Sequence, residues 1–273
     1  MEKMTIKETL GFIGSGNMAT ALIKGLIQSG AYEKEQILAA DKSKDCLTKA
    51  GETFGIRCCA SNLELALESA VILLAVKPQN MRDVLEEIKG KVRKDHLIIS
   101  IAAGIPLKMI REILAIDLPM IRVMPNTPAL IQEGASALAP GPFAGEKEMA
   151  TARKIFSAVG IVVEVEEAML DAVTALSGSG PGYVFRMMEC VVEAGITVGL
   201  KPDVALKLVM QTFLGAARLA GESEHPLPEL RKMVTSPGGT TAAGLGVFEE
   251  SDLKGIILKA VDAACRRSVE LGQ

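Results

Sequence analysis

Short apolar runs alternate with amphipathic stretches through the first part of the chain, up to Val165. The runs are rich in β-branched and aliphatic residues, as expected for strands that are covered on both faces. They lie at Leu10–Ile13, Ile37–Ala40, Val71–Val76, Leu97–Ile101, Ile121–Met124 and Ile161–Val165. Helices are predicted to begin near Asn17, Ser43, Asn62, Pro78, Pro106 and Gly145. This alternation predicts an α/β fold with a mostly parallel, doubly wound sheet.

The pattern changes after Val165, where no further strand-like run occurs. Two long helices are predicted at Pro181–Gly199 and Asp203–Gly221, and both carry apolar residues on more than one face. Helices with two apolar faces fit a subunit interface or the centre of their own bundle, and the sequence leaves both open. The sequence therefore predicts a sheet domain over residues 1–165 and an all-α domain over residues 166–273.

Composition supports sizeable cores and argues against several classes of partner. Of the 273 residues, 49% are hydrophobic, only 3% are aromatic, and the net charge is −3. The chain therefore lacks the stacking platforms and the basic surface typical of nucleic-acid-binding proteins. The five cysteines form no C-x-x-C pair, which favours a reducing, cytoplasmic location. Met1–Met4 has no signal-peptide character and the apolar stretch Gly182–Leu200 carries several charges, so we expect neither a signal peptide nor a membrane span.

A glycine-rich turn directly follows the first predicted strand. The turn reads Gly14-x-Gly16-x-x-Ala19, and an apolar helical pattern follows it. In dinucleotide-binding folds the first glycine permits a tight turn and the second lets backbone N–H groups approach a pyrophosphate. A small third residue lets the helix pack close to the strand. The strand–turn–helix setting predicts a dinucleotide site, although a structural glycine turn would show the same letters.

Four further loops of small or polar residues adjoin the predicted elements. They are Ala75–Pro78, Met124–Pro128, Leu176–Gly182 and Thr235–Thr241. The first two stand at the carboxyl ends of strands, the edge where doubly wound sheets bind ligands. In the last loop, backbone N–H groups and threonine hydroxyls could receive a small carboxylate. Each loop taken alone could equally be a structural turn.

The common catalytic side chains do not form a recognisable arrangement in this sequence. His96 precedes a strand and His225 lies in a proline-rich turn, so both are expected to be structural or surface residues. No H-E-x-x-H, C-x-x-C or spaced carboxylate cluster predicts a metal site. A site without an evident acid, base or metal suits a reaction in which a cofactor carries the chemistry.

Together these motifs resemble those of the pyrroline-5-carboxylate reductase family. The resemblance rests on Gly11–Ala19, Ala75–Pro78, Arg122–Pro128, Ala175–Pro181 and Ser236–Thr241, and it extends over nearly the whole chain. It implies reduction of the cyclic imine 1-pyrroline-5-carboxylate to L-proline with NAD(P)H, the last step of proline biosynthesis. It also implies a Rossmann-type N-terminal domain and a helical domain that binds substrate and forms homodimers, which in this family often assemble into larger rings.

The resemblance also assigns roles to individual residues. It implies that Thr241 is the catalytic residue, because its hydroxyl would lie close to the ring nitrogen of the substrate. Substrate contacts are implied for Ser236, Gly238, Gly239, Thr240 and Thr241. Cofactor contacts are implied for Gly14, Gly16, Asn17, Met18, Ala19, Asp41, Lys42, Val76, Lys77, Pro78 and Asn126. No metal is implied.

The residues after the second predicted strand give mixed signals about the cofactor. Asp41 would usually accept ribose hydroxyls and repel a 2′-phosphate. Lys42, Ser43 and Lys44 point the other way, because they could bind that phosphate. Since members of the family mostly favour NADPH or use both cofactors, we expect NADP(H), with NADH as the alternative.

Two alternative functions stay open at the level of sequence. A β-hydroxyacid dehydrogenase shares the glycine turn and a helical second domain, but it needs a helix lysine as acid or base, and Ala175–Cys190 contains none. A non-catalytic dinucleotide-binding redox sensor would use Cys58 and Cys59 as its switch. Only Arg57 is near enough in sequence to lower the pKa of either thiol, which favours inert cysteines.

Overall fold

The computed structural model describes residues 9–272, so Met1–Met4, on which the signal-peptide prediction rests, lies outside the described residues. The chain divides into two compact units. Among the described residues, the first unit holds 9–179 together with 264–272, and the second holds 180–263.

An eight-stranded sheet forms the centre of the first unit, in the order β3-β2-β1-β4-β5-β6-β7-β8. The strands are β1 (Leu10–Ile13), β2 (Ile37–Ala40), β3 (Arg57–Cys58), β4 (Val71–Leu74), β5 (Leu97–Ser100), β6 (Met120–Met124), β7 (Gly134–Pro140) and β8 (Gly160–Glu164). All neighbouring strands are parallel except β6 and β7. Because the strand order reverses at β1, loops after β1, β2 and β4 meet at one switch point of the sheet. The predicted mostly parallel, doubly wound sheet is confirmed.

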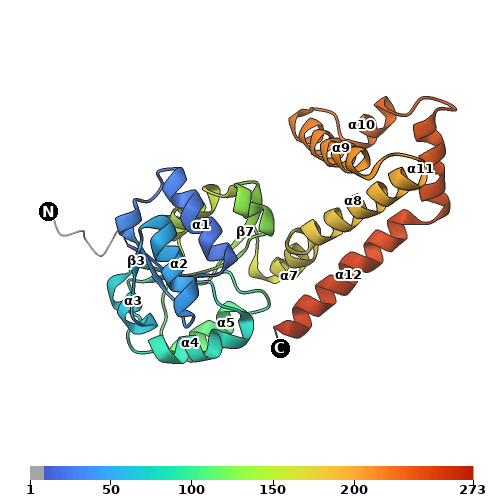
Figure 1. The fold of residues 1–273 in the computed structure, drawn as a ribbon. Coiled ribbons are helices and arrows are strands. Elements are labelled where there is room, and N and C mark those ends of the chain that lie inside the picture. Colours follow the sequence, from blue (N-terminus) through green and yellow to red (C-terminus); the bar gives the residue numbers. More distant parts are fainter. Residues whose placement is uncertain (1–8, 273) are drawn as a thin grey trace. The chain divides into compact units, whose positions relative to one another are not determined.

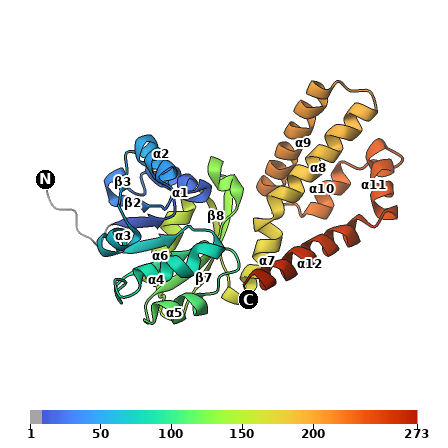
Figure 2. The same ribbon diagram turned by 60° about the horizontal axis from the view of Figure 1, so that its bottom comes forward.

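Helices cover both faces of this sheet (Figures 1 and 2). They are α1 (Asn17–Gln28), α2 (Lys44–Phe54), α3 (Asn62–Glu68), α4 (Met81–Ile88), α5 (Leu107–Leu114) and α6 (Glu146–Ser157). Successive strand residues enter different cores because their side chains point to opposite faces. Phe12 and Leu73 join a core with α1, α2 and α6, whereas Ile13 and Ile72 join a core with α3, α4 and α5.

The end of the sheet formed by β7 and β8 differs most from the sequence-based prediction. Strand β7 was not predicted, because its Ala-Ser-Ala-Leu-Ala stretch lacks the β-branched residues that mark the other strands. Strand β8 was expected to be covered on both faces, and this expectation is wrong. It forms the edge of the sheet, and Ile161 and Val163 are 66% and 51% exposed.

The first unit continues past the predicted domain boundary after residue 165. A short 3-10 turn (η5, Glu167–Met169), α7 (Leu170–Val173) and a π-helix (η6, Thr174–Gly178) follow β8. Leu170 is fully buried and packs with Ala137 and Ala139 of β7. The end of the chain also returns to this unit, where the Ser268 hydroxyl donates a hydrogen bond to Asp171 Oδ1 over 2.6 Å.

The second unit consists of helices, as the sequence predicts. They are α8 (Gly180–Thr197), α9 (Pro202–Glu222), α10 (Leu227–Met233), α11 (Thr240–Glu250) and α12 (Leu253–Leu271), of which α12 runs on into the first unit. Helix α10 was not predicted, and α11 begins at Thr240, within the predicted loop Thr235–Thr241.

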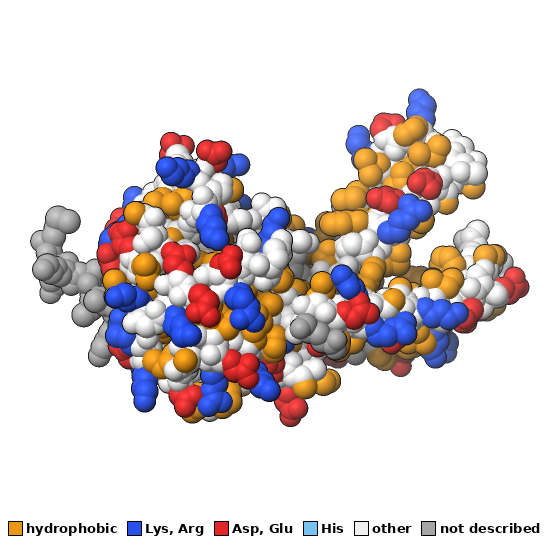
Figure 3. All heavy atoms as spheres, turned by 90° about the horizontal axis from the view of Figure 1, so that it is seen from below, with side chains coloured by type: hydrophobic (Ala, Val, Ile, Leu, Met, Phe, Trp, Pro, Cys, Tyr) orange, Lys and Arg blue, Asp and Glu red, His pale blue; other side chains and the backbone are white. Residues whose placement is uncertain are grey.

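Apolar side chains remain on the outside of the helical unit (Figure 3). In α9 only Ala205 and Val209 are buried, while Leu206 and Met210 are about half exposed. Among the described helices, α9 is the one that is long and apolar enough to cross a membrane, judged by length and composition only. A single such helix is weak evidence for a membrane span. Exposed apolar faces of this extent are typical of a surface that another protein chain covers.

Candidate active site

The glycine turn after β1 has the geometry of an anion-binding loop. Gly14 has a φ of 99°, and a Cβ atom there would lie 2.7 Å from the carbonyl oxygen of Ala75. A Cβ atom at Gly16 would meet nothing within 4 Å. Gly14 is therefore required by the fold, whereas Gly16 leaves open space beside the backbone.

Helix α1 begins directly after this turn with its first N–H groups uncapped. Its N-cap is Gly16, no side chain caps the helix, and its first turn carries no acidic residue. The backbone N–H groups around Asn17 and Met18 therefore lack helical acceptors and can bind an anion. Ala19 is 1% exposed and packs in the core against the sheet, as the motif predicts. These features fit a dinucleotide pyrophosphate.

Asp41 lies directly beside the glycine turn. Its Oδ2 accepts hydrogen bonds from the Ser15 backbone N–H at 2.6 Å and from the Ser15 hydroxyl at 2.8 Å. Its Oδ1 accepts a third from the backbone N–H of Ser43 at 2.8 Å. Lys42, next to it, is exposed, and its Nζ lies 3.9 Å from Asp83 Oδ2. The structure thus places Asp41 beside the glycine turn, and no sequence pattern had indicated its bonds to that turn.

A small hollow of about 50 Å³ opens at the same edge of the sheet. Its lining combines apolar walls with a polar rim: Ile13, Gly14, Ala40, Asp41, Lys42, Asn62, Val76, Asn80 and Val84. Asn62 is 6% exposed, and its amide donates a 2.7 Å hydrogen bond to Glu87 Oε2. The sequence pattern indicated Asn62 only as a helix start and gave no signal at Asn80. The hollow brings the predicted residues Gly14, Asp41, Lys42 and Val76 together.

Lys77 and Pro78 lie at the beginning of a short 3-10 helix (η3, Pro78–Asn80) directly after β4. The side chain of Lys77 is exposed. Since β4 neighbours β1 in the sheet, this loop and the glycine turn share one edge. The position is consistent with the predicted contact to the cofactor.

The side chain of Asn126, in the loop after β6, is fixed by hydrogen bonds to two other segments of the sheet unit. Its amide nitrogen donates to the carbonyl and to the hydroxyl of Ser177, both at 3.3 Å. Its side-chain oxygen accepts from the backbone N–H of Ala135 at 2.8 Å. The side chain thus ties β6 to the π-helix η6 and to β7. We expect any contact of this loop with a nicotinamide to involve its backbone as well.

The predicted substrate loop, Ser236–Thr241, belongs to the helical unit. Gly238 has a φ of 70°, and the N–H of Gly239 donates to the carbonyl of Ser236 at 3.0 Å to close the turn. Gly239 is the N-cap of α11, no side chain caps this helix, and its first turn has no acidic residue. The N–H groups at the start of α11 are thus available to a carboxylate. Because the helix begins at Thr240, Thr241 is not its cap.

The buried titratable groups of the sheet unit lie outside this site. Burial raises the pKa of the Cys59 thiol to about 11, and the Cys58 thiol donates a 3.4 Å hydrogen bond to the carbonyl of Leu47. A thiol with a raised pKa forms little thiolate, so Cys59 is poorly suited to a redox switch. Burial lowers the pKa of His96 to about 4. Within residues 9–272, no group of three or more His, Cys, Asp or Glu side chains could hold a metal ion.

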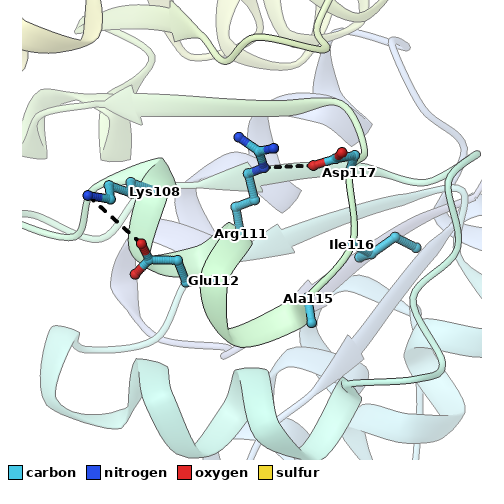
Figure 4. A pocket seen from close by; sticks show the side chains of 6 residues that line it. All are labelled: Lys108, Arg111, Glu112, Ala115, Ile116 and Asp117. Atoms are coloured by element: carbon cyan, nitrogen blue, oxygen red, sulfur yellow. Dashed lines mark hydrogen bonds and ion pairs between the residues drawn. The ribbon is translucent and has the colours of Figure 1, made fainter.

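A larger hollow of about 530 Å³ lies on α5, away from the predicted residues (Figure 4). Its lining includes two ion pairs, Lys108 with Glu112 and Arg111 with Asp117. The charged side chains that line it are therefore paired with one another. None of the residues predicted for catalysis or binding lines this hollow.

Two family models match the chain. The model of the pyrroline-5-carboxylate reductase dimerisation domain matches residues 167–271. The model of NADP oxidoreductase, coenzyme F420-dependent, matches residues 9–104, which include the glycine turn, Asp41 and Lys77.

Similar proteins match over nearly the full length. Pyrroline-5-carboxylate reductase of Methanosarcina acetivorans is 41% identical over 97% of this chain and 98% of its own, and that of Synechocystis is 43% identical with the same coverage. The solved structure of the Coxiella burnetii enzyme covers 98% of this chain and 99% of its own at 38% identity, with a TM-score of 0.92. The NADP-bound structure of the Plasmodium falciparum enzyme covers 99% of this chain and 100% of its own at 32% identity, with a TM-score of 0.88.

Proposed function

Because the chain belongs to the pyrroline-5-carboxylate reductase family, we propose that it reduces 1-pyrroline-5-carboxylate to L-proline with NAD(P)H, the last step of proline biosynthesis. The observation that carries this proposal is 41% identity over 97% of the chain, because the match spans both compact units. The β-hydroxyacid dehydrogenase alternative is weakened by the lack of a lysine in Ala175–Cys190, and the redox-sensor alternative by the raised thiol pKa of Cys59.

The cofactor is a nicotinamide dinucleotide, and when bound it supplies the hydride. Asn17–Ala19 would hold the pyrophosphate through backbone N–H groups at the start of α1, and Gly14 and Gly16 would shape the turn that lets it approach. Val76, Lys77 and Pro78 would lie along the nicotinamide ribose, with the Asn126 loop next to the nicotinamide. The uncapped helix start and the open space at Gly16 support this assignment.

The substrate end would be held by the Ser236–Thr241 loop. Backbone N–H groups near Gly238, Gly239 and Thr240 would bind the carboxylate, because the start of α11 is uncapped. The Thr241 hydroxyl would donate a hydrogen bond toward the ring nitrogen. A protonated imine accepts hydride at carbon directly, so these residues need to orient and polarise the substrate more than to transfer a proton.

We propose NADPH as the preferred form of the cofactor. Lys42 lines the 50 Å³ hollow after β2, and Ser43 and Lys44 follow it in the sequence, so a 2′-phosphate bound there would have two lysines nearby in the chain. NADH remains the alternative, because an acidic residue at the end of β2 usually favours it.

The dimerisation domain indicates an oligomer. We propose a homodimer built through the helices of residues 166–273, able to assemble into larger rings, with residues 1–165 as the dinucleotide-binding domain. We also propose that the protein acts in the cytoplasm on a small cyclic imino acid, with neither nucleic acid nor membrane as a partner. The exposed apolar faces of α8, α9, α11 and α12 support the dimer.

Steady-state kinetics with the same imine and each reduced cofactor test these proposals. We expect loss of nicotinamide absorbance with 1-pyrroline-5-carboxylate, and a higher kcat/KM with NADPH than with NADH. A hydroxy acid with NAD(P)⁺ serves as the control and should give no signal. Turnover of the hydroxy acid without turnover of the imine would favour a dehydrogenase, and silence in both assays would favour a sensor.

A further inference from the structure

Asp41 makes three hydrogen bonds within the protein, and two of them go to the glycine turn. The backbone N–H and the hydroxyl of Ser15 both donate to Oδ2, and the backbone N–H of Ser43 donates to Oδ1. An ionised carboxylate offers about four lone-pair sites. Most of the accepting capacity of Asp41 is therefore used before any ribose hydroxyl could reach it.

These bonds fix the position of the turn relative to the end of β2. The N–H of Gly14 donates to the carbonyl of Ala40 at 2.8 Å, so two successive residues of the turn are bonded to β2 and the residue after it. The Ser43 hydroxyl also accepts from the N–H of Cys46 and caps α2. Asp41 thus connects the turn before α1 with the start of α2. Because the Ser15 N–H points to Asp41, the pyrophosphate is left with the N–H groups at the start of α1.

The surroundings of Asp41 also make it easier for a phosphate group to bind nearby. The N–H and O–H groups that donate to Asp41 turn the positive ends of their dipoles toward the carboxylate, which offsets part of its field while its negative charge stays. Lys42 lines the same hollow, and its pairing with Asp83 at 3.9 Å is between two largely exposed side chains. Such exposed pairs are weak, so Lys42 can turn to another anion.

We propose that Asp41 is a positioning residue that clamps the phosphate-binding turn through Ser15, and that discrimination between NADPH and NADH rests on Lys42 instead. The proposal rests on the dinucleotide-dependent function proposed above. If Asp41 positions the turn, it contributes equally to the binding of NADPH and NADH. If it instead bound the ribose hydroxyls, it would favour NADH alone.

Calorimetric titration of the full-length protein with NADPH and with NADH separates the two roles. Asp41→Asn replaces an acceptor oxygen with an NH₂ group that must face an N–H donor. We expect Kd to rise for both cofactors by a similar factor, roughly ten- to hundredfold for lost bonds to a charged group. Lys42→Ala should weaken NADPH about tenfold and leave NADH unchanged. Lys49→Ala, an exposed lysine of α2, is the charge-matched control and should change neither affinity.

The hydroxyl of Ser15 provides a second test that does not disturb the fold. Ser15→Ala should weaken both cofactors by roughly two- to fivefold, because the backbone bond to Asp41 remains. In the double variant with Asp41→Asn, this loss should disappear, since the two side chains act through one contact. Melting temperatures of all variants, measured without cofactor, identify any variant that fails to fold.

Three results would overturn the proposal. The first is an Asp41→Asn protein that loses NADH and keeps or improves NADPH, which is the behaviour of a ribose ligand. The second is additive losses in the double variant, and the third is an unchanged cofactor ratio in Lys42→Ala. A wild-type protein that binds neither nucleotide would instead refute the proposed function, before any variant is compared.

Discussion

In the sheet unit, large apolar side chains lie inside two cores on either side of the strands, where Phe12, Leu22, Ile72 and Leu73 are fully buried. In the helical unit, α9 buries only Ala205 and Val209, and apolar side chains on α8, α11 and α12 are also largely exposed. The first unit therefore has the burial that a domain needs to fold on its own. The second exposes apolar faces of the kind that another protein chain covers. The family model of the dimerisation domain matches residues 167–271, which include this unit.

The largest effect is expected from charging the exposed face of α9. Leu206 and Met210 are about half exposed and stand one turn apart on this helix. Glutamate at both positions should abolish assembly and, with it, activity, because a buried unpaired charge is strongly unfavourable. Light scattering at micromolar concentration measures the assembly. Leu67→Glu on α3, at a leucine 47% exposed in the sheet unit, is the control and should leave assembly unchanged. A wild-type protein that is a stable monomer would contradict the inference that another chain covers the apolar faces of the helical unit.

The next effect separates folding from binding within the sheet unit. Gly16→Val should abolish dinucleotide binding without unfolding the protein, because a Cβ atom there meets no protein atom within 4 Å and the side chain would fill the space for the pyrophosphate. Gly14→Val should instead destabilise the unit, since its Cβ would lie 2.7 Å from the Ala75 carbonyl at a positive φ. Calorimetry and thermal melting distinguish the two outcomes. Unchanged cofactor affinity in Gly16→Val would contradict the assignment.

A smaller effect is expected in the substrate loop of the helical unit. Thr241→Ala should lower kcat roughly ten- to hundredfold and raise KM less, because the lost hydrogen bond acts mainly in the transition state. Since Thr241 does not cap α11, the melting temperature should hardly change. Thr240→Ala should have a smaller kinetic effect, because its backbone is the part assigned to the carboxylate. Equal kinetic losses at both threonines would show that this division of roles is wrong.

The last effect concerns the stability of the sheet unit at acid pH. His96 is 1% exposed, its Nδ1 accepts from the Arg93 N–H, and burial lowers its pKa to about 4. The folded protein thus holds His96 neutral, while the unfolded chain takes up a proton near pH 6.5. The stability that this residue contributes is complete above that pH and is lost as pH falls toward 4, by up to about 3 kcal/mol.

Urea unfolding at several pH values measures this loss. His96→Gln should flatten the profile between pH 6.5 and 4, because glutamine keeps an acceptor but does not titrate. The exposed His225 is the matched control, and His225→Gln should leave the profile as it is. Identical pH profiles for wild type and His96→Gln would contradict the role of His96.

The strands and turns with a strong local signal could be predicted from the sequence. The run into Gly14-x-Gly16-x-x-Ala19 specified β1, the turn and α1, because strand, glycines and helix period all agreed. Strand β7 was missed because its small residues are specified by pairing with β6 and β8, not by local propensity. The contacts of Asp41 with Ser15 and of Asn126 with Ser177 join residues far apart in the chain, so no local pattern could reveal them.

The return of α12 to the sheet unit makes the helical unit an insertion rather than an appendage. It leaves the first unit after Ser179, and the chain comes back at Ala264. Ser268 is bonded to Asp171, and Gly272 packs so closely on Gly104 that a Cβ atom would lie 2.4 Å from the Gly104 carbonyl. Cleavage of one peptide bond within residues 180–263 would therefore leave both fragments attached to the sheet unit, the second one through the contacts of Ser268 and Gly272.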